Sequence, residues 1–231
     1  MSSSALFRSP LQAWHRAHGA RLAEADGWET PAVYTAPEKE SAAAKTSLAL
    51  ADLSSFAKLA VRGPGVANWI AQFVGNGPVS KPLGVSRLDS GVLVCRLTAD
   101  QILLLASSPT LALGHGEHEL RCSALEMHFP AATGNLLAIN QTSALAGFSL
   151  VGHGVAKMLR HLTHLEFPPL DSCVQTRLAG VTALLIRTQE LSVPSLRIYV
   201  TCDLGEYLWE SLMEAGDVLP LGLDGWRSLL A

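Results

Sequence analysis

The chain alternates short apolar runs with segments in which apolar residues recur every three or four positions. The helical spacing predicts helices from Ser9 to Gly19, over Glu38–Leu50, after Gly65, after Gly154, and over Asp203–Ala215 with Asp203 as N-cap and Glu206 completing a capping box. The apolar runs predict strands over Leu59–Arg62, Val92–Leu97, Gln101–Ala106, Ser143–Val151, Cys173–Leu178, Val181–Arg187 and Leu196–Val200. The stretch Gly27–Pro37 is spaced by glycine and proline and indicates a loop.

Two segments share one pattern. LAVRGPGVANWIAQFV and FSLVGHGVAKMLRHLT both show a strand, a Gly-x-Gly break, and an amphipathic helix that begins with Val-Ala. Their first glycines, Gly63 and Gly152, lie farther apart than the ~20–50 residues of a solenoid repeat. The pattern therefore predicts a duplicated module. Because hairpins alternate with helices and no clear linker divides the chain, we expect one α+β domain with mostly antiparallel sheet.

Composition removes several classes of protein. The 231 residues are 48% hydrophobic and 16% charged, which is typical of a folded chain. The net charge of −3 argues against a general nucleic-acid binder, and no apolar run approaches the ~18 residues of a membrane helix. The start MSSSALFRSP lacks the apolar core of a secretory signal. The four cysteines are widely spaced and form no CxxC, so we expect reduced thiols in a cytoplasmic protein.

No catalytic motif is legible from residue types alone. The elbows Gly63-Pro64-Gly65 and Gly152-His153-Gly154 match neither phosphate-binding pattern and are interpreted as turns. No GxSxG sequence is present. Three histidine pairs have the i,i+3 spacing that can chelate a metal on a helix, but none has a third ligand fixed by spacing: His15/His18, His115/His118 and His161/His164. We interpret these pairs as solvated faces and expect no metal site.

Several segments resemble a known family. The run SPLQAWHRAHGARLAEADGWETPAVY and the block LADLSSFAKLAVRGPG resemble the opening of the glycine-cleavage aminomethyltransferase, or T-protein. LLIRTQELSVPSLRIYV, LWESLMEAG and PLGLDGWRSL resemble the end of its folate-binding region. The resemblance implies a folate-binding domain of the aminomethyltransferase type over residues 1–231, built as an intertwined duplication of antiparallel sheet and helices. It further implies a tetrahydrofolate pocket and no C-terminal barrel domain.

The acidic residues of that family are absent at their expected positions. The family's acidic pair falls on Ser90 and Gly91, and Asp89, the one candidate for rescuing catalysis, lies one residue short. The pterin-holding glutamate falls on Val193, although Glu190 is nearby, and a further glutamate falls on Arg197. A carboxylate accepts both donors of a pterin, whereas unpaired buried donors cost about 1–3 kcal/mol each. The resemblance therefore predicts that standard aminomethyl transfer is lost.

A remnant pocket is implied at four other positions. The family's pocket-lining methionine falls on Phe56, an asparagine after the hairpin on Ser107, and the terminal arginine on Trp226, while Arg187 matches the family. Phe56 and Trp226 could stack on a flat ring, and Arg187 could meet a carboxylate. These four residues are the candidate binding site for a folate-like small molecule.

A second resemblance keeps another reading open. FPPLDSCVQTRLAGVTALLIR and YLWESLMEAG look like the gamma subunit of heterotetrameric sarcosine oxidase, a small relative of the same fold. That subunit rests against catalytic partners, so the resemblance implies a non-catalytic subunit or assembly protein whose partner is another protein. A protein that binds a different small ligand in the old pocket is the third possibility.

Overall fold

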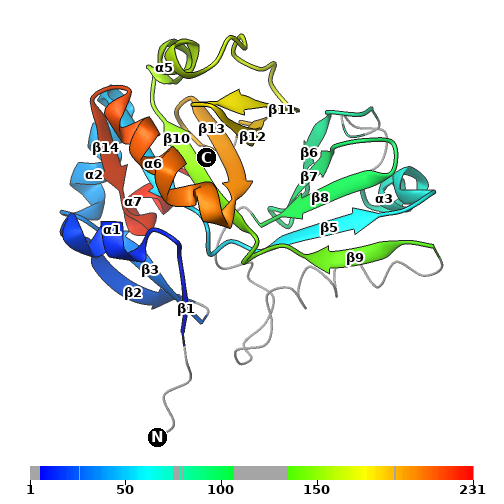
Figure 1. Ribbon diagram of the computed structural model, residues 1–231, viewed down its shortest axis with the longest axis horizontal. Coiled ribbons are helices and arrows are strands. Elements are labelled where there is room, and N and C mark those ends of the chain that lie inside the picture. The colour runs from blue at the N-terminus through cyan, green and yellow to red at the C-terminus, as the bar shows by residue number, and fades with distance from the viewer. Residues whose placement is uncertain are drawn as a thin grey trace, which may run out of the picture.

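The computed structural model describes residues 6–25, 27–74, 79, 81–106, 135–189 and 191–230, and its strands form three sheets (Figure 1). The five-stranded sheet has the order β6-β7-β8-β5-β9 and is antiparallel throughout. Its strands are β5 (Lys58–Arg62), β6 (Val85–Arg87), β7 (Leu93–Arg96), β8 (Gln101–Leu105) and β9 (Leu137–Asn140), and helix α3 (Val66–Val74) follows β5.

The six-stranded sheet has the order β11-β12-β13-β10-β4-β14. Its strands are β4 (Leu48–Asp52), β10 (Leu145–Val151), β11 (Ser172–Leu178), β12 (Val181–Arg187), β13 (Ser195–Thr201) and β14 (Val218–Leu221). Only the pair β14–β4 is parallel among these described strands. Helix α5 (Val155–Leu162) follows β10, and α6 (Gly205–Glu214) follows β13 through a short 3-10 turn over Cys202–Leu204.

The two larger sheets repeat one another, and the predicted duplication is confirmed by their strand orders. Strands β5, β6, β7 and β8 occupy in one sheet the places of β10, β11, β12 and β13 in the other. The copies are intertwined because β4, which precedes β5, pairs with β10, while β9, which precedes β10, pairs with β5. The paired elbow glycines also match: Gly63 (φ +139°) and Gly152 (φ +124°) each donate a hydrogen bond of 2.9 Å to the residue before the last strand of their copy.

A small third sheet near the N-terminus combines β1 (Phe7–Arg8), β2 (Arg21–Ala25) and β3 (Trp28–Val33), with α1 (Gln12–Ala17) beside them. The loop predicted over Gly27–Pro37 is therefore wrong for most of its length. Proline in the pattern concealed the strand, but Pro31 lies beside a register shift opposite Leu22, where a missing donor is tolerated.

Two further predictions need correction. The helix expected over Glu38–Leu50 is shorter: α2 covers Pro37–Thr46 and ends at the extended Ser47. The apolar residues that follow form β4, because burial between neighbouring strands outweighs their helix propensity. The capping box at Asp203 is absent: α6 starts at Gly205, and Leu204 is its N-cap without a side-chain bond. A last helix, α7 (Leu223–Arg227), was not predicted.

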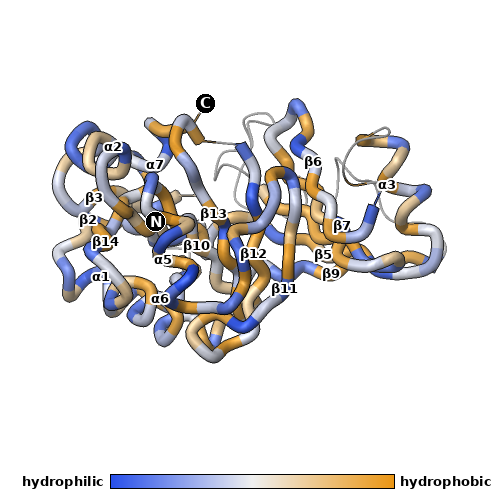
Figure 2. Tube along the Cα trace, turned by 90° about the horizontal axis from the view of Figure 1, so that it is seen from above, coloured by the Kyte–Doolittle hydropathy of each residue, from blue (hydrophilic) through white to orange (hydrophobic). Residues whose placement is uncertain are grey.

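The buried apolar residues form clusters that include most strands of the two larger sheets. In the trace coloured by hydropathy, hydrophobic stretches follow these strands (Figure 2). Within the described residues, no helix is long and apolar enough to cross a membrane. Cys95 and Cys173 are buried free thiols, and Cys202 is a half-buried one. Burial raises the pKa of the Cys173 thiol to about 11, so this group stays protonated.

Candidate functional site

A buried arginine, Arg197, lies on β13, at the position where the sequence resemblance implies a glutamate. The side chains of β13 alternate: Leu196 and Ile198 pack into the core against α6, whereas Arg197 and Tyr199 point to the other side of the sheet. Arg197 is 1% exposed. Its Nη1 donates to the carbonyl of Ala106 at 2.9 Å and lies 3.3 Å from the Tyr199 hydroxyl. These bonds hold a permanent positive charge inside the protein.

Two aromatic rings flank this guanidinium. Phe56, from the loop between β4 and β5, and Trp226, from α7, are buried and meet edge to face with centroids 5.5 Å apart. The guanidinium carbon of Arg197 lies 5.9 Å from the Phe56 ring and 5.7 Å from the Trp226 ring. The indole N–H of Trp226 and the hydroxyl of Ser55 are buried without a hydrogen-bond partner. The aromatic faces are thus already in contact with a side chain of the protein itself.

Lys58 adds a second buried cation on the neighbouring sheet. Its Nζ donates to the carbonyls of Ser54 and Phe56, each at 2.9 Å, and lies 6.0 Å from the Tyr199 ring. These bonds fix the loop that carries Phe56. Lys58 and Arg197 thus direct donors at carbonyl groups of the protein itself.

The structure places the predicted site residues as follows. Phe56 and Trp226 are brought together, as described. Arg187 ends β12, where its guanidinium stacks 4.2 Å from the Phe167 ring and donates to the Pro168 carbonyl at 2.7 Å. Ser107 lies outside the described residues, as does Glu190. Whether these positions contact a ligand stays a prediction.

The positions where the family resemblance implies acidic residues lie in a turn and in the apolar core. Asp89 is exposed in the turn before β7, and the neighbouring Ser90 hydroxyl is buried without a hydrogen-bond partner. Gly91 closes the turn in the left-handed region (φ +83°). Val193 is 7% exposed and belongs to the apolar cluster that includes Trp226. No carboxylate of these segments lies buried among the described residues.

A buried polar network beside this interior escaped sequence reasoning. His15 was interpreted as a solvated residue, but it is 1% exposed. Its Nε2 lies 3.0 Å from Oδ2 of Asp52, at the end of β4, and its Nδ1 lies 2.6 Å from the Tyr34 hydroxyl. Asp52 also accepts hydrogen bonds from the Ser9 hydroxyl and from the Ser54 N–H at 2.8 Å. The network ties α1 and β3 to β4 and to the loop that leads to Phe56.

Burial and hydrogen bonding oppose each other in this network. Burial disfavours the ionised form of Asp52, but the hydrogen bond and charge of His15, with hydrogen bonds from Ser54 and Ser9, outweigh it, so the pKa of Asp52 lies below its usual value. Burial, with the charges of Asp52 and Glu40, raises the pKa of Tyr34. Asp52 is therefore an ionised acceptor and Tyr34 a neutral hydroxyl at neutral pH.

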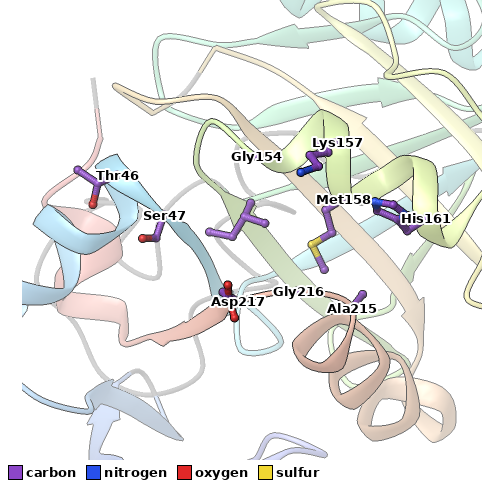
Figure 3. A pocket seen from close by; sticks show the side chains of 10 residues that line it. Thr46, Ser47, Gly154, Lys157, Met158, His161, Ala215, Gly216 and Asp217 are labelled. Carbon is purple, nitrogen blue, oxygen red and sulfur yellow. The ribbon is translucent and has the colours of Figure 1, made fainter.

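A separate open cavity of about 440 Å³ lies between the end of α2, helix α5 and the loop before β14. Figure 3 shows Lys157, Met158 and His161 projecting from α5, with Asp217 across from them. The charged groups come from exposed positions and carry both signs. Within the described residues, no group of three or more His, Cys, Asp or Glu side chains could hold a metal ion.

The chain matches the GCVT N-terminal domain family over residues 11–230 and belongs to that family. It is 26% identical over 228 residues to the aminomethyltransferase of Halothermothrix orenii and 28% identical over 238 residues to that of Streptomyces coelicolor, covering 94% and 96% of this chain. The chain spans 62% of the length of each of these relatives.

Solved structures confirm the fold class. The glycine cleavage system aminomethyltransferase T from Bartonella henselae superposes with a TM-score of 0.76 at 19% identity, over 97% of this chain and 62% of that one. A chain of the heterotetrameric sarcosine oxidase from Corynebacterium sp. U-96 superposes with a TM-score of 0.62 at 19% identity, over 90% of this chain and 94% of that one. Both resemblances noted in the sequence are thus found again in three dimensions.

Proposed function

We propose that this protein is a divergent aminomethyltransferase-family member, related to folate and one-carbon metabolism, that does not carry out the glycine-cleavage reaction. The observation that carries the proposal is Arg197, a buried arginine flanked by Phe56 and Trp226. The family resemblance implies a glutamate at this position, so an arginine there supports a changed site. The spacing of the cysteines supports a reducing compartment for this function.

The loss of acids has a chemical consequence. A pterin must give up hydrogen bonds to water when it enters a buried site, and a valine at position 193 returns none. Asp89 is exposed, so it does not place a charge beside a buried folate nitrogen. A folate bound here would therefore lack the carboxylate acceptors that the family resemblance implies at these positions.

An aminomethyl-transfer assay tests the proposal. With aminomethylated lipoyl carrier protein and tetrahydrofolate, we expect no turnover above the carrier background, because the family's acidic pair falls on Ser90 and Gly91 in this sequence. The Streptomyces coelicolor aminomethyltransferase serves as positive control. Turnover by the wild-type protein would contradict the proposal, and its loss in Asp89→Asn would assign the activity to that residue.

The second candidate function is a non-catalytic subunit or assembly protein. It is supported by the match to nearly the whole length of one chain of a heterotetrameric sarcosine oxidase. Native mass measurement after mild purification from the source cells separates the two functions. A fixed-ratio complex with a catalytic chain supports the subunit role, whereas a protein that runs alone supports the first proposal.

A further inference from the structure

A groove lies where the two copies of the duplicated module meet. The edge strands of the two larger sheets, β6 and β11, are neighbours here (Figure 1), joined by the bridge between Gly84 and Ser172. The groove is lined by the segment that precedes β6 and by the segment that leads into β11. The groove has a volume of about 610 Å³, and apolar side chains make up most of its wall. Ligand pockets usually have volumes of about 300–1,000 Å³ and are mainly apolar with a few polar groups. This groove is separate from the Arg197 interior.

Two strained residues build the groove. Leu83 is the third residue of a turn closed by a 3.1 Å bond from the Gly84 N–H to the Lys81 carbonyl, with Pro82 second. The φ of Leu83 is +65°, a value that glycine normally adopts at the third position of such a turn. Asp171, on the opposite side, has a φ of +54°. The third such residue among those described, Ala179, is accounted for by the tight β11–β12 hairpin turn.

The free-energy cost of the left-handed backbone at Leu83 is not offset by contacts that stabilise the fold. Its backbone is held by a 2.6 Å bond to the Arg96 carbonyl and a 2.8 Å bond from the Cys173 N–H, which glycine would make equally well. Its side chain remains 46% exposed, so little burial offsets the strain. Strained residues of this kind gather at ligand sites, where the ligand supplies the missing contacts.

The facing wall is rigid before any ligand arrives. The guanidinium of Arg187 stacks on Phe167 and bonds the Pro168 carbonyl, so it fixes the ring and the following prolines. The Ser172 hydroxyl donates to the Pro169 carbonyl at 2.6 Å. A wall built this way loses little conformational entropy on binding.

The charges of the rim are uneven. Glu166 and Asp171 are exposed carboxylates that line the groove, and Lys81 is the one cationic side chain among its described lining residues. Arg187 is not a lining residue, and its guanidinium is held by Phe167 and the Pro168 carbonyl. Neither carboxylate forms an ion pair with another described residue. A cationic group on a ligand is therefore favoured here over an anionic one.

We propose that this groove binds a small molecule with a ring-sized apolar body and one cationic group. The ring lies between Leu83 and Phe167, and the cation lies toward Asp171 and Glu166. A protein partner fits less well, because a specific interface buries over ~1,000 Å². Among the described residues that line the groove, Leu83 is the one large apolar side chain that is strongly exposed. The inference is independent of the proposed function.

Binding of three probes that share a phenylethyl body tests the proposal: 2-phenylethylamine, 3-phenylpropionate and 2-phenylethanol, followed by protein NMR shifts. We expect saturable binding of the amine with shifts at the groove, and weaker binding of the alcohol and the anion. Leu83→Gly is expected to weaken amine binding at least about fivefold while leaving the melting temperature equal or higher, because the strain is relieved.

Asp171→Asn gives the second arm, because asparagine also tolerates the left-handed backbone. The preference for the amine over the alcohol should fall about two- to fivefold, as for an exposed ion pair. Asp203→Asn, an exposed acid elsewhere, should leave the preference unchanged. The proposal is overturned if no probe binds saturably, if shifts map elsewhere, or if Leu83→Gly binds the amine as the wild type does. Binding of a protein segment in place of the probes would likewise overturn it.

Discussion

Replacing Gly152 by alanine is expected to lower the free energy of unfolding by about 3–5 kcal/mol, through a strained backbone and overpacking together. The backbone of Gly152 lies in a region (φ +124°) that side-chain-bearing residues rarely adopt, and an added Cβ would overlap the carbonyl oxygen of Ser47. That carbonyl immediately precedes β4, the strand exchanged between the copies. The substitution therefore disturbs the packing against the strand through which the two copies are intertwined.

Two matched glycines separate the contributions, with urea unfolding as the measurement. Gly19→Ala has a positive φ (+78°) but nothing within 4 Å of the new Cβ, so it is expected to cost only about 1–2 kcal/mol. Gly216→Ala has neither problem and should stay within about 0.5 kcal/mol. If Gly152→Ala is no more destabilising than Gly19→Ala, the close packing of the elbow against β4 is wrong.

Asp52→Ala is expected to destabilise the protein by about 3–5 kcal/mol, because removing one partner leaves buried polar groups unpaired. The groups affected are His15, Ser9 and the Ser54 N–H, which all bond this carboxylate. Asp217→Ala, an exposed acid without a described partner, should change stability by less than about 0.5 kcal/mol. Equal effects of the two substitutions would show that the buried network contributes nothing.

The same network predicts a pH dependence. The folded-state pKa of Asp52 is lowered, so its stabilisation is fully present above the unfolded pKa of ~3.9 and is lost as pH falls from there through the folded value. The stability difference between wild type and Asp52→Asn should therefore be constant at neutral pH and shrink in acid below ~pH 4. A difference that grows in acid would contradict the assigned direction.

Much of the fold could be predicted from the sequence because local patterns suffice for it. The two strand–glycine–helix segments predicted the duplication, and the apolar runs predicted most strands of the larger sheets. β4 was missed because an alanine-rich segment has helix propensity, whereas its strand depends on β10, a hundred residues away along the chain. β3 was missed because Pro31 is tolerated only through a register shift with β2.

The site was harder to predict because its partners are distant in sequence. His15 was interpreted as one residue of a solvated pair, and no residue close to it in the sequence indicated its contacts with Asp52 and Tyr34. Arg187 was carried over as a ligand residue, yet in the structure its guanidinium contacts Phe167 and Pro168. Arg197 was noticed only as a departure from the family. Its contacts with Phe56 and Trp226 required three elements to be placed together.

Tetrahydrofolate binding, measured as a shift of the melting temperature, tests the central claim most directly. Because the family resemblance implies acids where this sequence has Arg197 and Val193, the account predicts no rise at millimolar tetrahydrofolate. A ligand present at a hundred times its Kd adds about 2.7 kcal/mol, which for a chain of this size is a rise of about 5–10 °C. A saturable rise of that size would contradict the account and restore a working folate site to this protein.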